Sequence, residues 1–191
     1  YSPDLNSWAV LTAFQNAVHT LEDAEPGHPL LAEAQRLMLC AETSCYWYWT
    51  GQQVWDQQVT NAANLGAGLI GPSIDALVAA GHDRSGPTIF PPWVTPENPG
   101  GKRWGQGCLL DAPRHGVAHT FVADVSGLKR VELVLRTSHG ESRLPMRNHG
   151  PYPSQTGAAA TADYFTADLP VGAGDLRYYV EEGGVTFSGG E

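Results

Sequence analysis

Four aromatic residues stand in a row at residues 46–49, within the stretch AETSCYWYWTGQQVWDQQV at residues 41–59. Aromatic rings beside amide and carboxylate side chains suit a flat polar ligand such as a sugar, because ring faces take its C–H groups and polar groups take its hydroxyls. Successive residues on a helix point about 100° apart, so these rings point in every direction. A few short helices do not bury them all, and we therefore expect another surface to meet this aromatic belt.

That surface has two interpretations, which the spacing leaves open. The belt is either a core between helices and a neighbouring domain, which spacing alone favours, or a platform for a ligand. For the second case the candidate substrate-binding residues are Tyr46, Trp47, Trp49, Trp55 and Asp56. Glycoside hydrolysis needs a pair of carboxylates. Glu42 and Asp56 flank the belt, but either is equally well explained as a solvated helix residue, and we assign no catalytic residue.

Other chemistry finds little support in the sequence. His115 and His119 are four apart, a metal-binding spacing on a helix. They lie at the start of an expected strand, where at roughly 3.3 Å per residue their Cα atoms would be about 13 Å apart. The chain has no G-x-S-x-G elbow and no phosphate-binding loop. Gly66, Gly68 and Gly71 have G-x-G-x-x-G spacing, but they end a helical stretch rather than follow a strand, which argues against nucleotide binding. The sequence therefore predicts no metal site and no cofactor.

Composition narrows the class of protein. The chain has 191 residues and a net charge of −9, which argues against nucleic acid as a partner because its phosphates would be repelled. It contains no unbroken run of eighteen apolar residues, so we expect no membrane span. The three cysteines do not have the spacing of a disulfide framework, which favours a reducing compartment such as the cytoplasm. The chain begins with Tyr1 and shows no signal peptide, which suggests a piece of a longer protein.

The first 80 residues have helical periodicity. Apolar residues recur at three and four from Leu5 to Leu21, and the segment AEPGHP ends this helix at residues 24–29. A second helix is expected to begin at Leu30 and to run through Ala41 into the aromatic cluster, and a third is expected after a break at Thr50–Gly51. Pro72 fits the first turn of a separate short helix, Ser73 to Ala80. These elements predict a small helical bundle over residues 1–80.

The remaining chain is expected to be extended. Residues 81–107 are rich in proline and glycine yet hold apolar residues, and predict an ordered connector laid on one or both units. From residue 108 alternation at period two predicts a hairpin across Ser126–Gly127, then two strands joined by VGAG, and a last strand at GVTFS, with 140–160 as loop. Residues 108–191 therefore predict an antiparallel, immunoglobulin-like β-sandwich, and the whole chain an α+β protein of two units.

Three stretches together resemble the C-terminal part of glycoside hydrolase family 57, which includes α-amylases, amylopullulanases and glucan-branching enzymes. They are AETSCYWYWTGQQVWDQQVTNAANLG, GPTIFPPWVTPENPGGKRWG and TFVADVSGLKRVELVLR. The resemblance covers most of the chain. Where related members often have Ser-Asp-aromatic, this chain has Ser44-Cys45-Tyr46, which removes a carboxylate.

The resemblance implies a non-catalytic role. The family's catalytic glutamate and aspartate lie on a β/α barrel that precedes the helices, and no such barrel is present here. Tyr46 and Trp47 best match the aromatic residues that line the family's glucan cleft. The expected partners are therefore that barrel and an α-glucan such as starch. Two alternatives remain: an autonomous carbohydrate-binding module, with its site at Trp93, Trp104 or Tyr152, and a protein-interaction domain with an apolar helical face.

Overall fold

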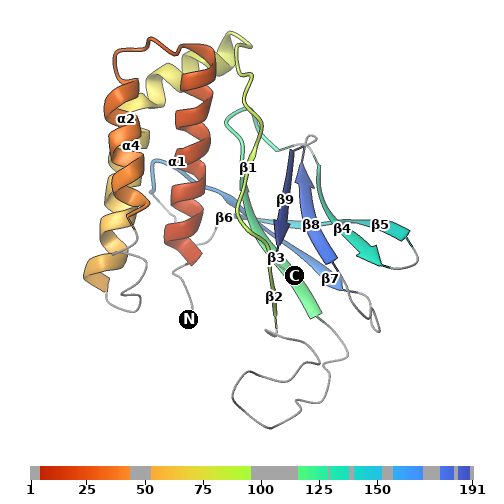
Figure 1. The fold of residues 1–191 in the computed structure, drawn as a ribbon. Helices are drawn as coiled ribbons and strands as arrows, with labels where there is room; N and C mark the ends of the chain where they lie inside the picture. The colour runs from red at the N-terminus through yellow and green to blue at the C-terminus, as the bar shows by residue number, and fades with distance from the viewer. Residues whose placement is uncertain are drawn as a thin grey trace.

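The computed structural model describes residues 5–43, 53–95, 116–128, 130–137, 140–151, 157–169, 177–182 and 185–189. For residues 6, 53–56, 137, 177–179, 182 and 185–189 only the backbone is described. Within these ranges the protein has three helices and two antiparallel sheets, so the expected α+β class is confirmed. Figure 1 shows the helices on one side of the sheets, with α1 nearest to them.

Helices α1 (Leu5–Ala24), α2 (Leu31–Ala41) and α4 (Gln53–Ala79) pack on one another through small and branched apolar side chains. Both predicted ends of the first helix and the predicted start of the second are confirmed to within a residue. The predicted continuation of the second helix into the aromatic cluster is wrong, because α2 ends at Ala41 and Glu42 and Thr43 are not helical. Phe14 of α1 is fully buried and seats its ring on Gly66 of α4. Burying such a side chain contributes roughly 1.5–3 kcal/mol to stability. The α1–α4 contact depends on a glycine at residue 66, because a Cβ atom there would occupy the place of the Phe14 ring.

The prediction of a separate short helix after Pro72 is wrong. Helix α4 runs unbroken for 27 residues with Pro72 inside it. Proline inside a helix removes one backbone hydrogen bond, and here burial of Ile70, Ile74 and Leu77 on both sides of it outweighs that loss.

Helix α4 is also the one described helix that is long and apolar enough to cross a membrane, over Gln57–Ala79. A third of that window is buried inside the protein. This is weak evidence for a membrane span, because a core helix meets the same criteria, and α4 supplies much of the helical core.

The nine strands of the described residues form two sheets. One sheet has the order β1-β3-β7-β6, with β2 also pairing with β3, and the other has the order β5-β4-β8-β9. We call these sheets A and C. Their strands are β1 (Thr88–Ile89), β2 (Trp93–Thr95), β3 (Gly116–Ala123), β4 (Val131–Thr137), β5 (Gly140–Pro145), β6 (Arg147–Pro151), β7 (Asp163–Leu169), β8 (Arg177–Glu182) and β9 (Val185–Gly189).

Each sheet places one face in a shared apolar cluster, and α1 covers part of the other face of sheet A. The shared cluster contains Ala118, Val122, Phe165, Ala167 and Leu169 from sheet A, and Val131, Leu133, Leu135 and Val180 from sheet C. Phe121 and Ala123, on the opposite face of β3, join the helical core instead. Strand β3 therefore contributes to an apolar cluster on each of its two faces, which explains why apolar residues follow one another along it with few polar interruptions.

The predictions of two hairpins, β3 with β4 and β7 with β8, are wrong. Strand β3 pairs with β1, β2 and β7, whereas β4 pairs with β5 and β8, so the turn at Ser126–Gly127 crosses between sheets. Likewise β7 and β8 lie in different sheets. Alternation predicts that a segment is a strand but carries no information about which strand it pairs with. The last expected strand is confirmed as β9.

The expected loop at residues 140–160 is also wrong in its first half, because β5 and β6 occupy most of 140–151. Both strands are exposed and polar, and each pairs with a neighbour on one side only. Edge strands of this kind lack the apolar alternation by which strands are found in a sequence.

Residues 82–95, which we call the strap, run between α1 and sheet A. The Asn16 side-chain amide donates to the carbonyl of Gly86 (2.9 Å), and the hydroxyls of Thr20 and Ser85 are 2.6 Å apart. The strap then pairs with β3 through β1 and β2. The division of the chain into residues 1–80, 81–107 and 108–191 stays a prediction, and its boundary at 107/108 lies outside the described residues.

Candidate functional site

The five residues predicted to bind substrate lie between the end of α2 and the first turn of α4 or within that turn. Tyr46, Trp47 and Trp49 lie outside the described residues, and for Trp55 and Asp56 only the helical backbone of α4 is described. Helix α2 ends and α4 begins at the end of the helical layer where α1 starts (Figure 1). Of the module candidates, Trp104 and Tyr152 also lie outside the described residues, whereas Trp93 is on β2.

Trp93 is part of a row of rings that crosses sheet A. The centroids of Trp93 and His119 are 5.3 Å apart with an interplanar angle of 15°, and those of His119 and Tyr164 are 5.9 Å apart with an angle of 12°. His149 continues the row at 5.4 Å and 35° from Tyr164. We call these four residues the ring row; they come from β2, β3, β7 and β6.

The ring row leaves aromatic surface available. Carbon atoms in contact are about 3.5–4.0 Å apart, so nearly parallel rings with centroids more than 5 Å apart are offset rather than fully overlapped. Trp93, His119 and Tyr164 are half-buried and His149 is exposed. The four residues of the row therefore keep part of their surface open to solvent.

Hydrogen bonds fix the histidines of the ring row. The two ring nitrogens of His119 are paired: Nε2 with the Thr95 hydroxyl, and Nδ1 with Tyr164 Oη at 2.6 Å. His149 Nε2 is 2.8 Å from the Thr166 hydroxyl. Burial lowers the pKa of His119, and charge on His149 lowers this pKa further. His119 is therefore held neutral near pH 7, with one ring nitrogen donating and the other accepting.

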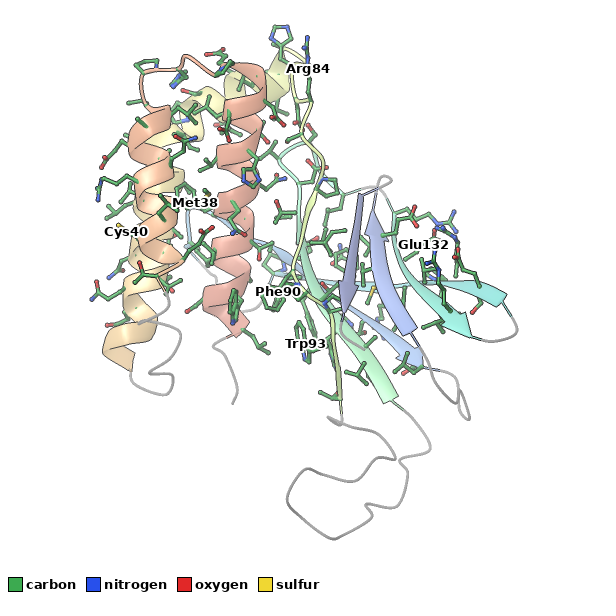
Figure 2. The ribbon with its side chains drawn as sticks, viewed as in Figure 1. Met38, Cys40, Arg84, Phe90, Trp93 and Glu132 are labelled. Carbon is green, nitrogen blue, oxygen red and sulfur yellow. The ribbon has the colours of Figure 1, made fainter. Side chains whose placement is uncertain are left out.

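A deeper aromatic cluster holds the row in place. Phe90 lies 4.7 Å from Trp8 of α1 and 5.9 Å from Trp93, centroid to centroid, and Figure 2 shows Phe90 and Trp93 on the strap between α1 and the sheets. Phe90 donates its backbone N–H to the carbonyl of Phe121 (2.8 Å), and its own carbonyl accepts from the Thr120 hydroxyl (2.6 Å). The strap thus fixes Trp93 from both the helical side and the sheet side.

The row can bind but carries no evident reaction chemistry. A sugar could place its C–H face on the exposed ring surface and hydrogen-bond through its hydroxyls to the imidazole, phenol and hydroxyl groups at the edge. The ring row contains no carboxylate and hence no acid–base pair for glycoside hydrolysis. Among the residues that the structure describes, no group of three or more histidine, cysteine or acidic side chains is close enough to hold a metal ion.

A cleft of about 220 Å³ lies between α1, α4 and the loops at one end of sheet A. Its walls are short side chains, with the carboxylates of Asp75 and Asp124 among them. Its lining residues are Ala13, Asn16, Ala17, Ala67, Gly71, Ile74, Asp75, Ala123, Asp124, Val125, Ala159, Ala160 and Thr161. The Asn16 side chain is fully engaged there, because its Oδ1 accepts from the Val125 backbone N–H (2.8 Å).

Sequence reasoning found Trp93 but missed its companions in the row. The spacing of His115 and His119 suggests a metal site alone, the loop expected at residues 140–160 includes His149, and alternation indicates no more than a strand at Tyr164. One signal was present: His119 alternates with Phe121 on a strand expected to face a core, which places its ring on an apolar face. The contact with Tyr164 depends on the β3–β7 pairing, which alternation does not reveal.

Comparisons with known proteins add no family assignment. No protein-family model matches the chain, and no curated protein matches its sequence.

Proposed function

We propose that this chain is the non-catalytic C-terminal part of an α-glucan-acting glycoside hydrolase. In this proposal the helices line and buttress the cleft of a catalytic barrel elsewhere in the protein, with the aromatic belt at residues 46–56 facing that cleft. The resemblance of the three sequence stretches to family 57 supports the proposal. A second support is that the belt lies between the end of α2 and the start of α4, both at one end of the helical layer.

We further propose that the three helices form a small bundle and that the two sheets form an immunoglobulin-like β-sandwich. The mutual packing of α1, α2 and α4 supports the first point. The apolar cluster shared by two antiparallel sheets supports the second, since sandwiches bury the inner faces of both sheets in one core.

One observation carries the glucan-binding part of the proposal: four rings from four strands of sheet A form a row whose members are half-buried or exposed. Flat polar ligands such as glucose units suit that combination. The same observation favours the second candidate function, an autonomous carbohydrate-binding module, because the row includes Trp93. In both cases the ring row contacts α-glucan, and the chain alone hydrolyses none.

Affinity electrophoresis of the whole chain in gels cast with and without amylopectin tests this proposal. We expect retardation by amylopectin that weakens in the variant His149→Ala, because His149 is the exposed end of the row. The matched control is His82→Ala, an exposed histidine of the strap near the end of α4, which should leave retardation unchanged. Equal mobility of the native chain in both gels would refute glucan binding.

Incubation of the same chain with starch tests the non-catalytic part. We expect no release of reducing ends above the buffer control. Release that is abolished by Glu42→Gln or by Asp56→Asn would show that the chain carries its own acid–base residues.

A further inference from the structure

Strand β5 is an open edge of sheet C. It pairs with β4 on one side, and within the described residues no strand lies beyond it on the other. Figure 1 shows it at the end of the sheets farthest from the helices. Five of its six residues are exposed, and only Leu144 is half-buried. An edge strand of this kind presents backbone N–H and C=O groups with which a further strand can pair.

The register with β4 shows which backbone groups of β5 point outward. Met146, one residue beyond β5, donates its N–H to the Val131 carbonyl (2.9 Å). Opposed residues of an antiparallel pair alternate between those that exchange hydrogen bonds and those that do not. Counting back in the same register, Arg143 and Glu141 fall in the second class, so their N–H and C=O groups point away from β4. Pro145 also falls in this class, which suits a residue without an N–H.

The side chains of the same two residues carry opposite charges. Glu141 and Arg143 are two apart in the strand and therefore lie on the same face of sheet C. Ion pairs within the chain hold both side chains in place: Arg143 Nη1 is 2.8 Å from Glu181 Oε2, and Arg136 Nε is 3.1 Å from Glu141 Oε2. Side chains that are ordered before association lose less conformational entropy when a partner binds.

These two features select one way in which β5 can pair with itself. A two-fold axis at Ser142 sets Glu141 opposite Arg143 of the other copy. In this register opposite charges face each other, and the outward N–H and C=O groups of both residues exchange hydrogen bonds. An axis at Glu141 would oppose two glutamates. An axis at Arg143 would oppose two arginines and set Glu141 against Pro145, which has no N–H.

We propose that β5 is a self-association edge, through which two copies of this chain join their C sheets by antiparallel β5–β5 pairing. A two-fold interface uses the same patch on both copies, so the patch must be complementary to itself. Charges on an edge strand usually keep other strands away. Opposite charges two residues apart instead admit the one register in which each meets the other.

The edge strand β6 of sheet A lacks this complementarity. Its one arginine or carboxylate is Arg147, so no axis along the strand sets opposite charges against each other. Its pairing with β7 is also irregular between Asn148 and Pro151, which disturbs the row of outward backbone groups. Of these two edges, β5 is therefore the one that fits a second copy of the chain.

The short contact sets the strength of the pair. Strand β5 has six residues and is about 20 Å long. Pairing along one strand edge of that length buries less than the roughly 800 Å² per partner of a standard stable interface. The dimer is accordingly weak, and it forms as protein concentration rises from about 10 µM towards about 1 mM.

Sedimentation equilibrium of the whole chain over that range tests the proposal. The weight-average mass should rise with concentration towards twice the monomer mass. Glu141→Lys should weaken association about tenfold or more, because it replaces both attractive cross-strand pairs of the dimer by repulsive ones. Far-UV circular dichroism checks that the variant is folded. The matched control is Arg147→Glu, which changes the charge at an exposed position on the edge strand of the other sheet and should leave association unchanged.

A mixture of two variants tests the register. Glu141→Lys and Arg143→Glu each set like charges opposite one another in their own dimers. In a mixed dimer the new lysine faces the new glutamate, and the native Arg143 of one copy faces the native Glu141 of the other. The equimolar mixture should therefore associate more than either variant alone at the same total concentration. Arg143→Gln replaces the glutamate variant should that variant unfold, since its mixed dimer keeps one attractive pair.

Three results would each overturn the proposal: a native chain that stays monomeric throughout, association insensitive to Glu141→Lys, or a mixture that associates no more than its components. Loss of association in Arg147→Glu would place the contact at sheet A and would overturn the proposal as well.

Discussion

Gly66 of α4 lies directly against the ring of Phe14 of α1. A Cβ atom at residue 66 would be 2.0 Å from Phe14 Cζ and 2.6 Å from Cε2. Real carbon atoms do not approach this closely, and the Phe14 side chain is fully buried. The absence of a side chain at residue 66 therefore sets the distance between the two helices.

Gly66→Ala should destabilise the protein by about 1–3 kcal/mol, the usual cost of forcing extra volume into a packed core. The measurement is the midpoint of urea unfolding. Gly68→Ala is the matched control: it lies two residues away on the same helix, exposed and with no atom within 4 Å of its added Cβ. It should stabilise by about 0.5–1 kcal/mol through helix propensity. Equal effects of the two changes would contradict the packing described.

Asn16 joins α1 to both the strap and the turn after β3, through the Gly86 carbonyl and the Val125 N–H. Asn16→Leu should cost about 1–3 kcal/mol, because two backbone groups lose their partner in a partly buried place. Asn61→Leu, at an exposed position of α4, is the control and should change stability little. Chemical denaturation of both variants checks this, and an unaffected Asn16→Leu protein would rule out the anchoring role.

The lowered pKa of His119 makes stability depend on pH. An unfolded histidine binds a proton near pH 6.5, whereas burial and His149 hold the folded pKa below that value. Between the two values the unfolded state binds more protons, so stability rises with pH. This contribution is fully present above about pH 6.5 and is lost as pH falls through the folded pKa.

Urea unfolding of the native protein and of His119→Gln between about pH 5 and pH 8 measures this effect. The native protein should lose stability towards the acidic end, and the variant should lose less. His149→Ala should reduce the pKa shift of His119, since it removes the second cause of that shift. If His119→Gln lost more stability than the native chain as the pH falls, the lowered pKa of His119 would be contradicted.

The sequence predicts α1 and the start of α2 well because the proline and glycine after Ala24 are strong boundary signals, but no such signal marks the end of α2 at Ala41. It fails at Pro72, where the local cost of proline is outweighed by core contacts along α4. It also fails at Arg143 and Arg147, whose strands are exposed edges without apolar alternation.

The ring row shows a different reason for failure. Trp93, His119, Tyr164 and His149 come from four strands, and their contact requires β2 and β7 to pair on either side of β3. The predicted hairpin of β3 with β4 excludes this arrangement, because it gives β3 a different neighbour. Pairing partners are set by which faces are buried between helices and sheets, and this is a property of the whole fold.

The most direct test of glucan contact at the ring row is proton NMR of the histidine rings during titration with maltoheptaose. Variants His119→Gln and His149→Ala assign the two signals. We predict that the ring signals of His119 and His149 shift with one common saturation curve, while those of the exposed His19 and His82 stay in place. Unshifted signals of His119 and His149 at saturating sugar would contradict the account.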